Sequence, residues 1–473
     1  MNIQKTIEFV EKKWHQEIQP TIEEYIRIPN MSKSFDPEWN TNGLQEKAAN
    51  LLFEWAKKQD LKNATYELIK DADKSPLIYI EVPGTTDNTE TVLMYGHFDK
   101  QPPFTGWLEG LEFNKPVVID DKLYGRGGAD DGYSIFGAVT SIKACQEQGL
   151  PHSRCVIMIE GDEESGSTHF PLYLEKLRHR LGEISVVFCL DSGALNYEQF
   201  WTTSSLRGAV MLTLNVKVLE EGVHSGDASG VVPSSFRILR ILLDRIEDSK
   251  TGEMHEDLQV NIPVYNYSQA VKVSETMPDS IINKFPFVQG MQPTTKNALN
   301  AYINKTWKSQ LSITGADYLP QAQSAGNVLR PQTSIKLSIR LPPTKDPEQA
   351  KETLVKLLTE NPPYGAQVTC TNVVGMGGWK CPKIEGYLED SIQSASQAFY
   401  GKEALSLAEG GSIPLMGLLL GLFPKSQFII TGVLGPNSNA HGPNEFLHIP
   451  FTKKLICCMS KILSDIYPKL KKQ

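Results

Sequence analysis

Metal-ligand residues directly follow two apolar segments of this chain. His97 and Asp99 come after VLMYG, and Glu163 and Glu164 lie in the acidic cluster EGDEES that follows CVIMI. The end of a buried strand is a poor place for an unpaired imidazole or carboxylate, because burying either group is costly. Each motif alone has a common structural explanation, a satisfied core histidine or a surface pair of acids. Together they favour strands that deliver metal ligands.

Three further candidate ligands occur in similar settings. Asp191 follows the apolar run ISVVFCL, and His441 lies in a loop of glycine, asparagine and proline after QFIITGV. Asp130 and Asp131 occupy the glycine-rich turn LYGRGGADDG just before a helical pattern. Such a pair is also typical of a helix N-cap, and the glycine spacing lacks the Lys and Ser/Thr of a phosphate loop. Beside the other motifs, Asp130 is a candidate bridge between two cations.

The elements between these motifs predict an α/β fold. The helical patterns YSIFGAVTSIKACQEQ and FPLYLEKLRHRL separate the apolar runs, and this alternation is typical of a mostly parallel sheet with helices on both faces. Ligands of such sheets bind beyond the carboxyl ends of the strands. We therefore expect the candidate residues to meet at one sheet edge. Nitrogen and oxygen ligands without cysteine suit zinc, manganese or cobalt.

The middle of the chain has a different pattern of hydrophobic and polar residues, which predicts a second domain. RGAVMLTLNVKVLE and TSIKLSIRLPP alternate as half-exposed strands, and SSFRILRILLDRI is an amphipathic helical pattern. We expect a catalytic domain formed by residues 1–206 and 381–473, with an inserted α+β lid at 207–380. The stretch from about 250 to 326 has no periodicity that assigns its elements.

Composition limits the partners and the compartment. The formal charge is −8 and no basic run stands out, which argues against a nucleic-acid partner. The seven cysteines form no CxxC pair, as in a reducing compartment. The first twenty residues are charged and helical in pattern, unlike a signal peptide, and IPLMGLLLGLF is too short to span a membrane. We expect a cytoplasmic protein without a membrane partner.

The motifs carry a family resemblance in combination. YGHFDKQP, LYGRGGADDG, EGDEESGS, CLDSG, HSG and AHGPNE resemble, in that order, the blocks of the M20 family of dinuclear metallopeptidases. The length and the long central segment are most similar to its carnosinase-like dipeptidase branch. The resemblance implies two divalent cations in each chain, zinc first, with manganese or cobalt as alternatives. It also implies a homodimer formed through the lid domain.

The resemblance assigns ligands to particular residues. It implies that one cation is held by His97, Asp130 and Asp191, and the other by Asp130, Glu164 and His441. Asp130 would bridge the two cations, and the peptide bond after it would be cis.

The resemblance also implies catalytic roles for two acids. Asp99 would accept a hydrogen bond from the second ring nitrogen of His97 and fix its tautomer. Glu163 would be the general base, taking a proton from a metal-bridging water and returning it to the leaving amine.

Substrate contacts are implied for five residues. His224 in EEGVHSGDASG would polarise the scissile carbonyl, often from the partner subunit, and Asn327 and Arg340 would hold the carboxylate end of the substrate. Gly411 and Ser412 in SLAEGGSIPLMG resemble the glycine-rich substrate loop of the family. Each residue has an ordinary alternative, such as a surface histidine, a turn asparagine or a helix N-cap serine.

The leading hypothesis is a metal-dependent hydrolase that cleaves the amide bond of dipeptides or short peptides. The alternative is an N-acyl-amino-acid amidohydrolase with the same mechanism, because both use a carboxylate clamp. An inactive amino-acid-binding relative is a third reading, but such a protein would be expected to have lost a ligand or the base.

Overall fold

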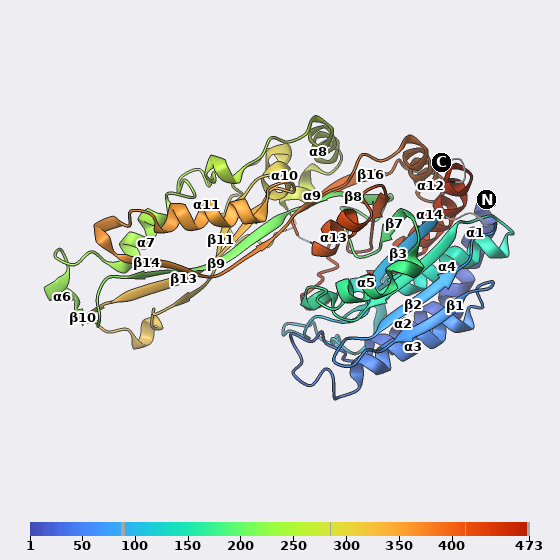
Figure 1. Ribbon diagram of the computed structural model, residues 1–473, viewed down its shortest axis with the longest axis horizontal. Helices are drawn as coiled ribbons and strands as arrows, with labels where there is room; N and C mark the ends of the chain where they lie inside the picture. Colours follow the sequence, from blue (N-terminus) through green and yellow to red (C-terminus); the bar gives the residue numbers. More distant parts are fainter. Residues whose placement is uncertain (87–89, 284, 412, 471–473) are drawn as a thin grey trace. The chain divides into compact units, whose positions relative to one another are not determined.

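The computed structural model describes residues 1–86, 90–283, 285–411 and 413–470 (Figure 1). The chain divides into two compact units, which are considered separately below. The first unit comprises Met1–Thr203, Cys381–Leu407 and Leu418–Gln473. The second unit comprises Ser204–Lys380 and Ala408–Gly417.

A six-stranded sheet forms the centre of the first unit (Figure 1). In spatial order its strands are β1 (Thr65–Ile69), β2 (Leu77–Val82), β6 (Arg154–Glu160), β3 (Thr91–His97), β7 (Ile184–Cys189) and β17 (Gln427–Ile430). The last four strands run parallel to one another, and β2 joins them antiparallel through β6. All seven residues of β3 are buried, as expected for a central strand covered on both faces.

Two neighbouring residues of β3 show how helices cover both faces. The Tyr95 ring packs edge-on against Phe170 of α5 (Phe170–Leu181), with ring centroids 5.2 Å apart. Gly96 points to the opposite face, where any side chain would clash with Ser134 at the start of α4 (Ser134–Glu147). The predicted α/β fold class, with helices on both faces of a largely parallel sheet, is confirmed.

The remaining helices of the first unit complete its core. They are α1 (Ile3–Lys13), α2 (Gln19–Ile26), α3 (Leu44–Lys58), α12 (Gly386–Tyr400) and α14 (Ile449–Leu470). Helix α14 packs against α4 and α12.

The apolar run IPLMGLLLGLF forms α13 (Pro414–Leu422), in which Met416 and Leu419 are buried. Within the described ranges, none of the helices has the length and apolar character needed to cross a bilayer.

Two further sheets are small. One contains β15 (Trp379–Lys380), β8 (Trp201–Leu206) and β16 (Leu405–Glu409), in that order. The other contains β18 (Phe446–His448), β5 (Lys122–Tyr124) and β4 (Val117–Ile119).

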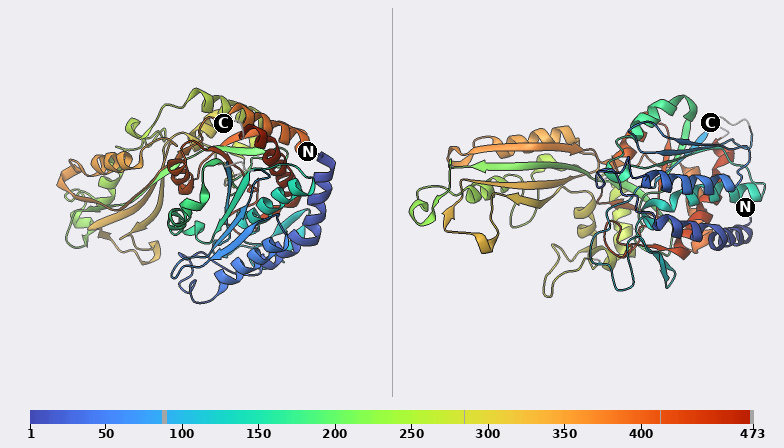
Figure 2. Two further views of the ribbon diagram at one scale, coloured as in Figure 1. Left: turned by 45° about the vertical axis from the view of Figure 1, so that its right-hand side comes forward. Right: turned by 90° about the horizontal axis from the view of Figure 1, so that it is seen from below.

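An antiparallel sheet organises the second unit (Figure 2). Its order is β11 (Gln310–Asp317), β13 (Gln332–Leu341), β9 (Gly208–Lys217) and β14 (Gln367–Met376). Alternate residues of β9, from Val210 to Val216, enter one apolar core with α7 (Ser235–Leu243) and α11 (Pro347–Thr359). The half-exposed strands and the amphipathic helix predicted for this region are therefore present.

The stretch that sequence patterns left unassigned contains helices and a strand. It forms α8 (Val264–Thr276), α9 (Pro278–Ile282), α10 (Ala298–Thr306) and then β11. Helix α8 buries Asn266 and Ser274 along with Ala270 and Val273. Because half of these buried positions are polar, the hydrophobic period that predicts a helix is lost.

Candidate metal centre

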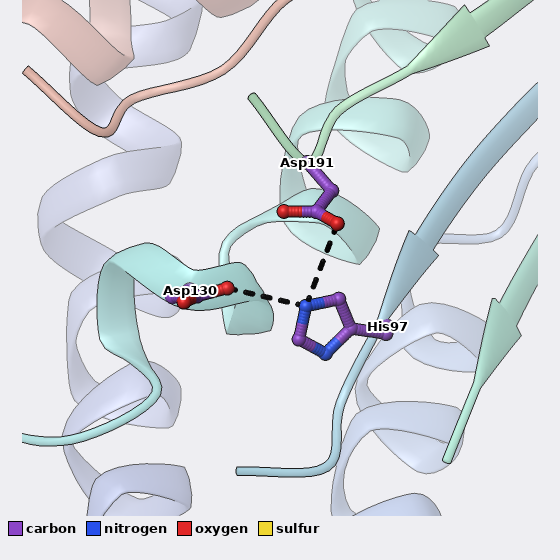
Figure 3. A group of neighbouring side chains, drawn as sticks. All are labelled: His97, Asp130 and Asp191. Carbon is purple, nitrogen blue, oxygen red and sulfur yellow. Dashed lines mark hydrogen bonds and ion pairs between the residues drawn. The ribbon is translucent and has the colours of Figure 1, made fainter. Parts of the chain in front are cut away.

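The first cluster of ligand-type side chains comprises His97, Asp130 and Asp191. His97 is the last residue of β3, Asp130 lies in the turn Gly128–Gly132, and Asp191 follows β7. The His97 Nε2 atom lies 3.2 Å from Asp130 Oδ1 and 3.9 Å from Asp191 Oδ2, and both carboxylates point toward the ring (Figure 3). One ligand atom from each residue lies within 4.8 Å of the others, which is close enough to surround one cation.

The second cluster shares Asp130 with the first. The His441 Nε2 atom lies 3.0 Å from Asp130 Oδ2 and 3.2 Å from Glu164 Oε2. The two oxygens of Asp130 therefore face different imidazoles, Oδ1 toward His97 and Oδ2 toward His441. This is the arrangement of a carboxylate that bridges two cations. The Asp130–Asp131 peptide bond is cis.

Asp99 connects His97 to the turn that carries the two glutamates. Its carboxylate accepts hydrogen bonds from the main-chain N–H groups of Glu163 and Glu164, each at 3.1 Å. The second ring nitrogen of His97 lies 3.2 Å from the main-chain oxygen of Asp99 and 3.4 Å from its carboxylate. The family resemblance implies that the Asp99 carboxylate accepts the hydrogen bond of the His97 ring, whereas the main-chain oxygen of Asp99 is slightly closer.

Glu163 lies beside the first cluster without belonging to either triad. Its Oε2 atom is 3.9 Å from His97 Nε2. The neighbouring residue Glu164 takes part in the second triad and also accepts a hydrogen bond of 2.6 Å from the Gln101 side chain. Of the two adjacent glutamates, only Glu164 belongs to one of the two triads.

The electrostatics of the site fit cation binding. Burial, followed by the charge of Asp130, raises the pKa of Glu164 to about 7. Burial likewise raises the pKa of Asp191 to about 6. Burial, followed by the charge of Asp191, raises the pKa of Glu163 well above its ordinary value. A group of buried carboxylates that resist ionisation is stabilised by cations, so the donor set fits two divalent ions.

Family comparison agrees with this geometry. The model of peptidase family M20/M25/M40 matches residues 93–465, a range that includes both triads. The chain belongs to this family. The predicted enzyme class, a metallopeptidase, is thereby confirmed.

Individual M20 peptidases are similar over most of the chain. The cysteinylglycine-S-conjugate dipeptidase of Corynebacterium striatum is 24% identical over 80% of this chain and 80% of its own length. The Cys-Gly metallodipeptidase dug1 of Schizosaccharomyces pombe is 23% identical over 99% of this chain and 100% of its own. The structure of human carnosine dipeptidase 1 superposes with a TM-score of 0.74 at 19% identity, covering 99% of each chain. This structural similarity shows a shared fold.

Two residues that sequence reasoning missed support the M20 ligand loops. Glu445 is fully buried, and one of its oxygens accepts hydrogen bonds from the N–H groups of Gly127, Ala129 and Asp130 at 3.0–3.3 Å. Its other oxygen lies 2.6 Å from Arg126 Nη1. Both residues fall inside quoted blocks, GRGGADDG and AHGPNE, so the motifs marked them without indicating a role.

Asp131 is expected from the sequence only as the neighbour of the ligand Asp130, but it also supports the site. Its Oδ2 atom accepts a hydrogen bond of 3.1 Å from the main-chain N–H of His97. Burial raises the pKa of Asp131 well above its ordinary value. The contact fixes the end of β3, from which the His97 ring extends.

The predicted substrate residues lie in the second unit, at two separate places. His224 ends β10 (Val223–His224), which pairs with β12 (Val328–Leu329), and Asn327 accepts a hydrogen bond of 3.0 Å from the N–H of Ser225. His224 and Asn327 are therefore neighbours, and both are exposed. Arg340 lies near the far end of β13, eight residues beyond the start of that strand at Gln332.

The glycine loop lies near the Arg340 end of the sheet. The main-chain oxygen of Gly410 accepts a hydrogen bond of 3.1 Å from Arg207, which immediately precedes β9. At this end of the sheet Ala209 of β9 pairs with Arg340. Gly411 is exposed, and Ser412 lies outside the described residues.

Proposed function

We propose that this metallopeptidase cleaves dipeptides, with Glu163 as its general base. The observation that carries the proposal is the shared carboxylate of Asp130, whose two oxygens face two imidazoles, next to a glutamate outside both triads. Names of similar proteins support the substrate class, since the curated relatives include dipeptidases acting on Cys-Gly and β-Ala-His.

His97, Asp130 and Asp191 would hold one cation, and Asp130, Glu164 and His441 the other. We propose zinc first, with manganese or cobalt as alternatives, because the donors are imidazoles and carboxylates. Bound cations would lower the pKa of a water molecule and polarise the scissile carbonyl.

The protein's own groups would move the proton. Glu163 accepts a proton from the attacking water and transfers it to the leaving amine, so that water adds across the amide bond. Burial raises the pKa of Glu163 above its ordinary value, which makes this carboxylate a stronger proton acceptor. Asp99 holds the main chain of Glu163 and so orients the base.

Arg340 would bind the substrate carboxylate through its planar guanidinium, with Gly411 and Ser412 lining the substrate loop. His224 and Asn327 would approach the substrate from a partner subunit. The span of β13 supports this division, because eight strand residues cover about 27 Å, whereas a dipeptide extends about 7 Å. A homodimer formed through the second unit would bring His224 of the partner subunit to the substrate that Arg340 holds.

We propose a cytoplasmic location. All seven cysteines are free, and five of them are buried. Such usage suits a reducing compartment.

A substrate panel with a matched variant tests the proposal. Purified protein should hydrolyse dipeptides with free amino termini, lose activity with a chelator, and regain it with zinc or manganese. Glu163→Gln should lower kcat by at least about a hundredfold while retaining both cations by elemental analysis. Cleavage of N-acetyl amino acids without cleavage of dipeptides would favour the amidohydrolase instead. Loss of metal in Glu163→Gln would make this residue a ligand.

A further inference from the structure

A cavity of about 290 Å³ lies within the second unit, and its lining includes none of the metal-centre residues. Except for Arg207, its lining residues come from the stretch that sequence patterns left unassigned, and the apolar part includes Ile281, Phe285, Phe287 and Met291. Phe285, Phe287 and Met291 are 47%, 44% and 59% exposed. Apolar side chains gathered around an open cavity are typical of a site for a small apolar group.

The cavity adjoins the end of the sheet that carries Arg340. Gln310 lines the cavity and is the direct cross-strand partner of Arg340 in the β11–β13 pair. Directly paired residues place their side chains on the same face of a sheet, with Cβ atoms about 5 Å apart. Arg207, a second lining residue, precedes β9 and donates to the main-chain oxygen of Gly410. The cavity, the glycine loop and Arg340 thus lie around one end of the sheet.

Two lining residues of this cavity carry a positive charge. Arg207 and Lys305 are in its lining, and among the described lining residues none is acidic. Burial, together with the charge of Arg340, lowers the pKa of Arg207 to about 10. A substrate carboxylate bound at Arg340 would interact favourably with the positive charges of Arg340 and Arg207.

We propose that this cavity is the pocket for the side chain of the substrate's C-terminal residue, and that it selects dipeptides ending in a bulky apolar residue such as leucine or phenylalanine. The inference rests on the proposed dipeptidase function, because it takes Arg340 as the carboxylate clamp. The side chain and the carboxylate of that residue branch from one Cα atom. When Arg340 holds the carboxylate, the side chain is directed to the neighbouring Gln310 and into the cavity.

Filling the cavity tests the inference. Ala301 of α10 lines it, whereas Ala298 of the same helix does not, so Ala298→Phe is a matched control for Ala301→Phe. Wild-type protein should cleave Ala-Leu and Ala-Phe with kcat/KM at least about tenfold above Ala-Gly. Ala301→Phe should remove that preference while leaving Ala-Gly cleavage within about twofold, and Ala298→Phe should leave both unchanged. If Ala301→Phe does not fold, Phe287→Ala and Met291→Ala remove exposed wall residues instead. Each should lower the preference for Ala-Leu and Ala-Phe over Ala-Gly.

The outcomes separate the two proposals. Cleavage of all three dipeptides at similar rates, or an equal loss for all three in Ala301→Phe, would overturn the pocket and leave the dipeptidase function standing. Failure to cleave any dipeptide in the presence of zinc or manganese would overturn the proposed function, and the pocket with it.

Discussion

Arg126 and Glu445 form a buried ion pair, with Nη1 of Arg126 only 2.6 Å from a carboxylate oxygen of Glu445. Their side chains are 2% and 0% exposed. Glu445 also accepts the N–H of Asp130, and Arg126 also donates to the main-chain oxygen of Gly442 at 2.7 Å. One ion pair therefore fixes the turn that carries the bridging aspartate and the loop that carries His441.

Removing the positive charge of Arg126 should strongly destabilise the protein. Arg126→Met leaves the buried Glu445 charge uncompensated, so the free energy of unfolding should fall by about 3–5 kcal/mol. Urea unfolding of the metal-loaded protein measures the change. Lys402→Met is the control, because its ion pair with Glu198 is exposed and should contribute no more than about 1 kcal/mol. Equal effects of the two substitutions would show that the buried pair has no special role.

The shared aspartate gives a clear prediction about metal content. Asp130→Asn should lower the occupancy of both cation sites, since each imidazole faces one of its oxygens. Asp191→Asn should lower the occupancy of one site only, because Asp191 belongs to the first triad alone. Elemental analysis after dialysis should therefore give close to one cation in Asp191→Asn and fewer in Asp130→Asn. Equal retention by both variants would contradict a bridging role.

The convergence of these ligands was predictable because strand geometry is simple. His97 ends β3, Asp191 follows β7, and Glu164 follows β6. The carboxyl ends of parallel strands meet at one edge, so apolar runs that end in ligand-type residues are sufficient to indicate the site. The pair of aspartates before a helix equally predicts an N-cap, so Asp130 is a candidate bridge only beside the other motifs, and the family resemblance adds which ligands share it.

The supporting contacts could not be predicted in the same way. Arg126 and Glu445 are 319 residues apart, and no local pattern connects them. Helix α8 escaped prediction because its buried face contains polar residues such as Asn266. Separation of His224 from Arg340 depends on the register of β13 with β9, which the sequence does not specify. Long-range pairing and burial of polar groups are tertiary properties, whereas periodicity reports only local structure.

Asp99 should matter to catalysis although it belongs to neither triad. Asp99→Ala removes the acceptor of the Glu163 and Glu164 N–H groups, so the turn that carries the base and a ligand loses its anchor. We expect kcat or metal affinity to fall by about 10–100-fold, as for other residues that orient metal ligands. Stopped-flow kinetics and metal titration would measure both. Asp99→Asn should behave similarly, because an amide accepts these hydrogen bonds less strongly than a carboxylate.

Metal binding should release protons. Burial lowers the pKa of His441, but hydrogen bonds to Asp130 and Glu164 outweigh burial and raise that pKa to about 11. A ligating imidazole is neutral, so His441 must give up its proton when a cation binds. Affinity should therefore rise by roughly tenfold per pH unit for each proton released, with Glu164 adding to the release below about pH 7. Titration calorimetry in buffers of different ionisation enthalpy counts the protons, and a pH-independent affinity would contradict this expectation.

Hybrid dimers should test whether His224 acts across subunits. Mixing His224→Ala with Glu163→Gln, after dissociation and reassociation, creates hybrids in which one of the two sites pairs an intact Glu163 with an intact His224. If half of the dimers are hybrids, about one quarter of wild-type activity should return. Mixing Glu163→Gln with Asp191→Asn is the control, since both residues lie in the first unit of one chain and no site is restored. Absence of recovery in the first mixture, with hybrids demonstrated by native mass spectrometry, would show that His224 acts within its own chain.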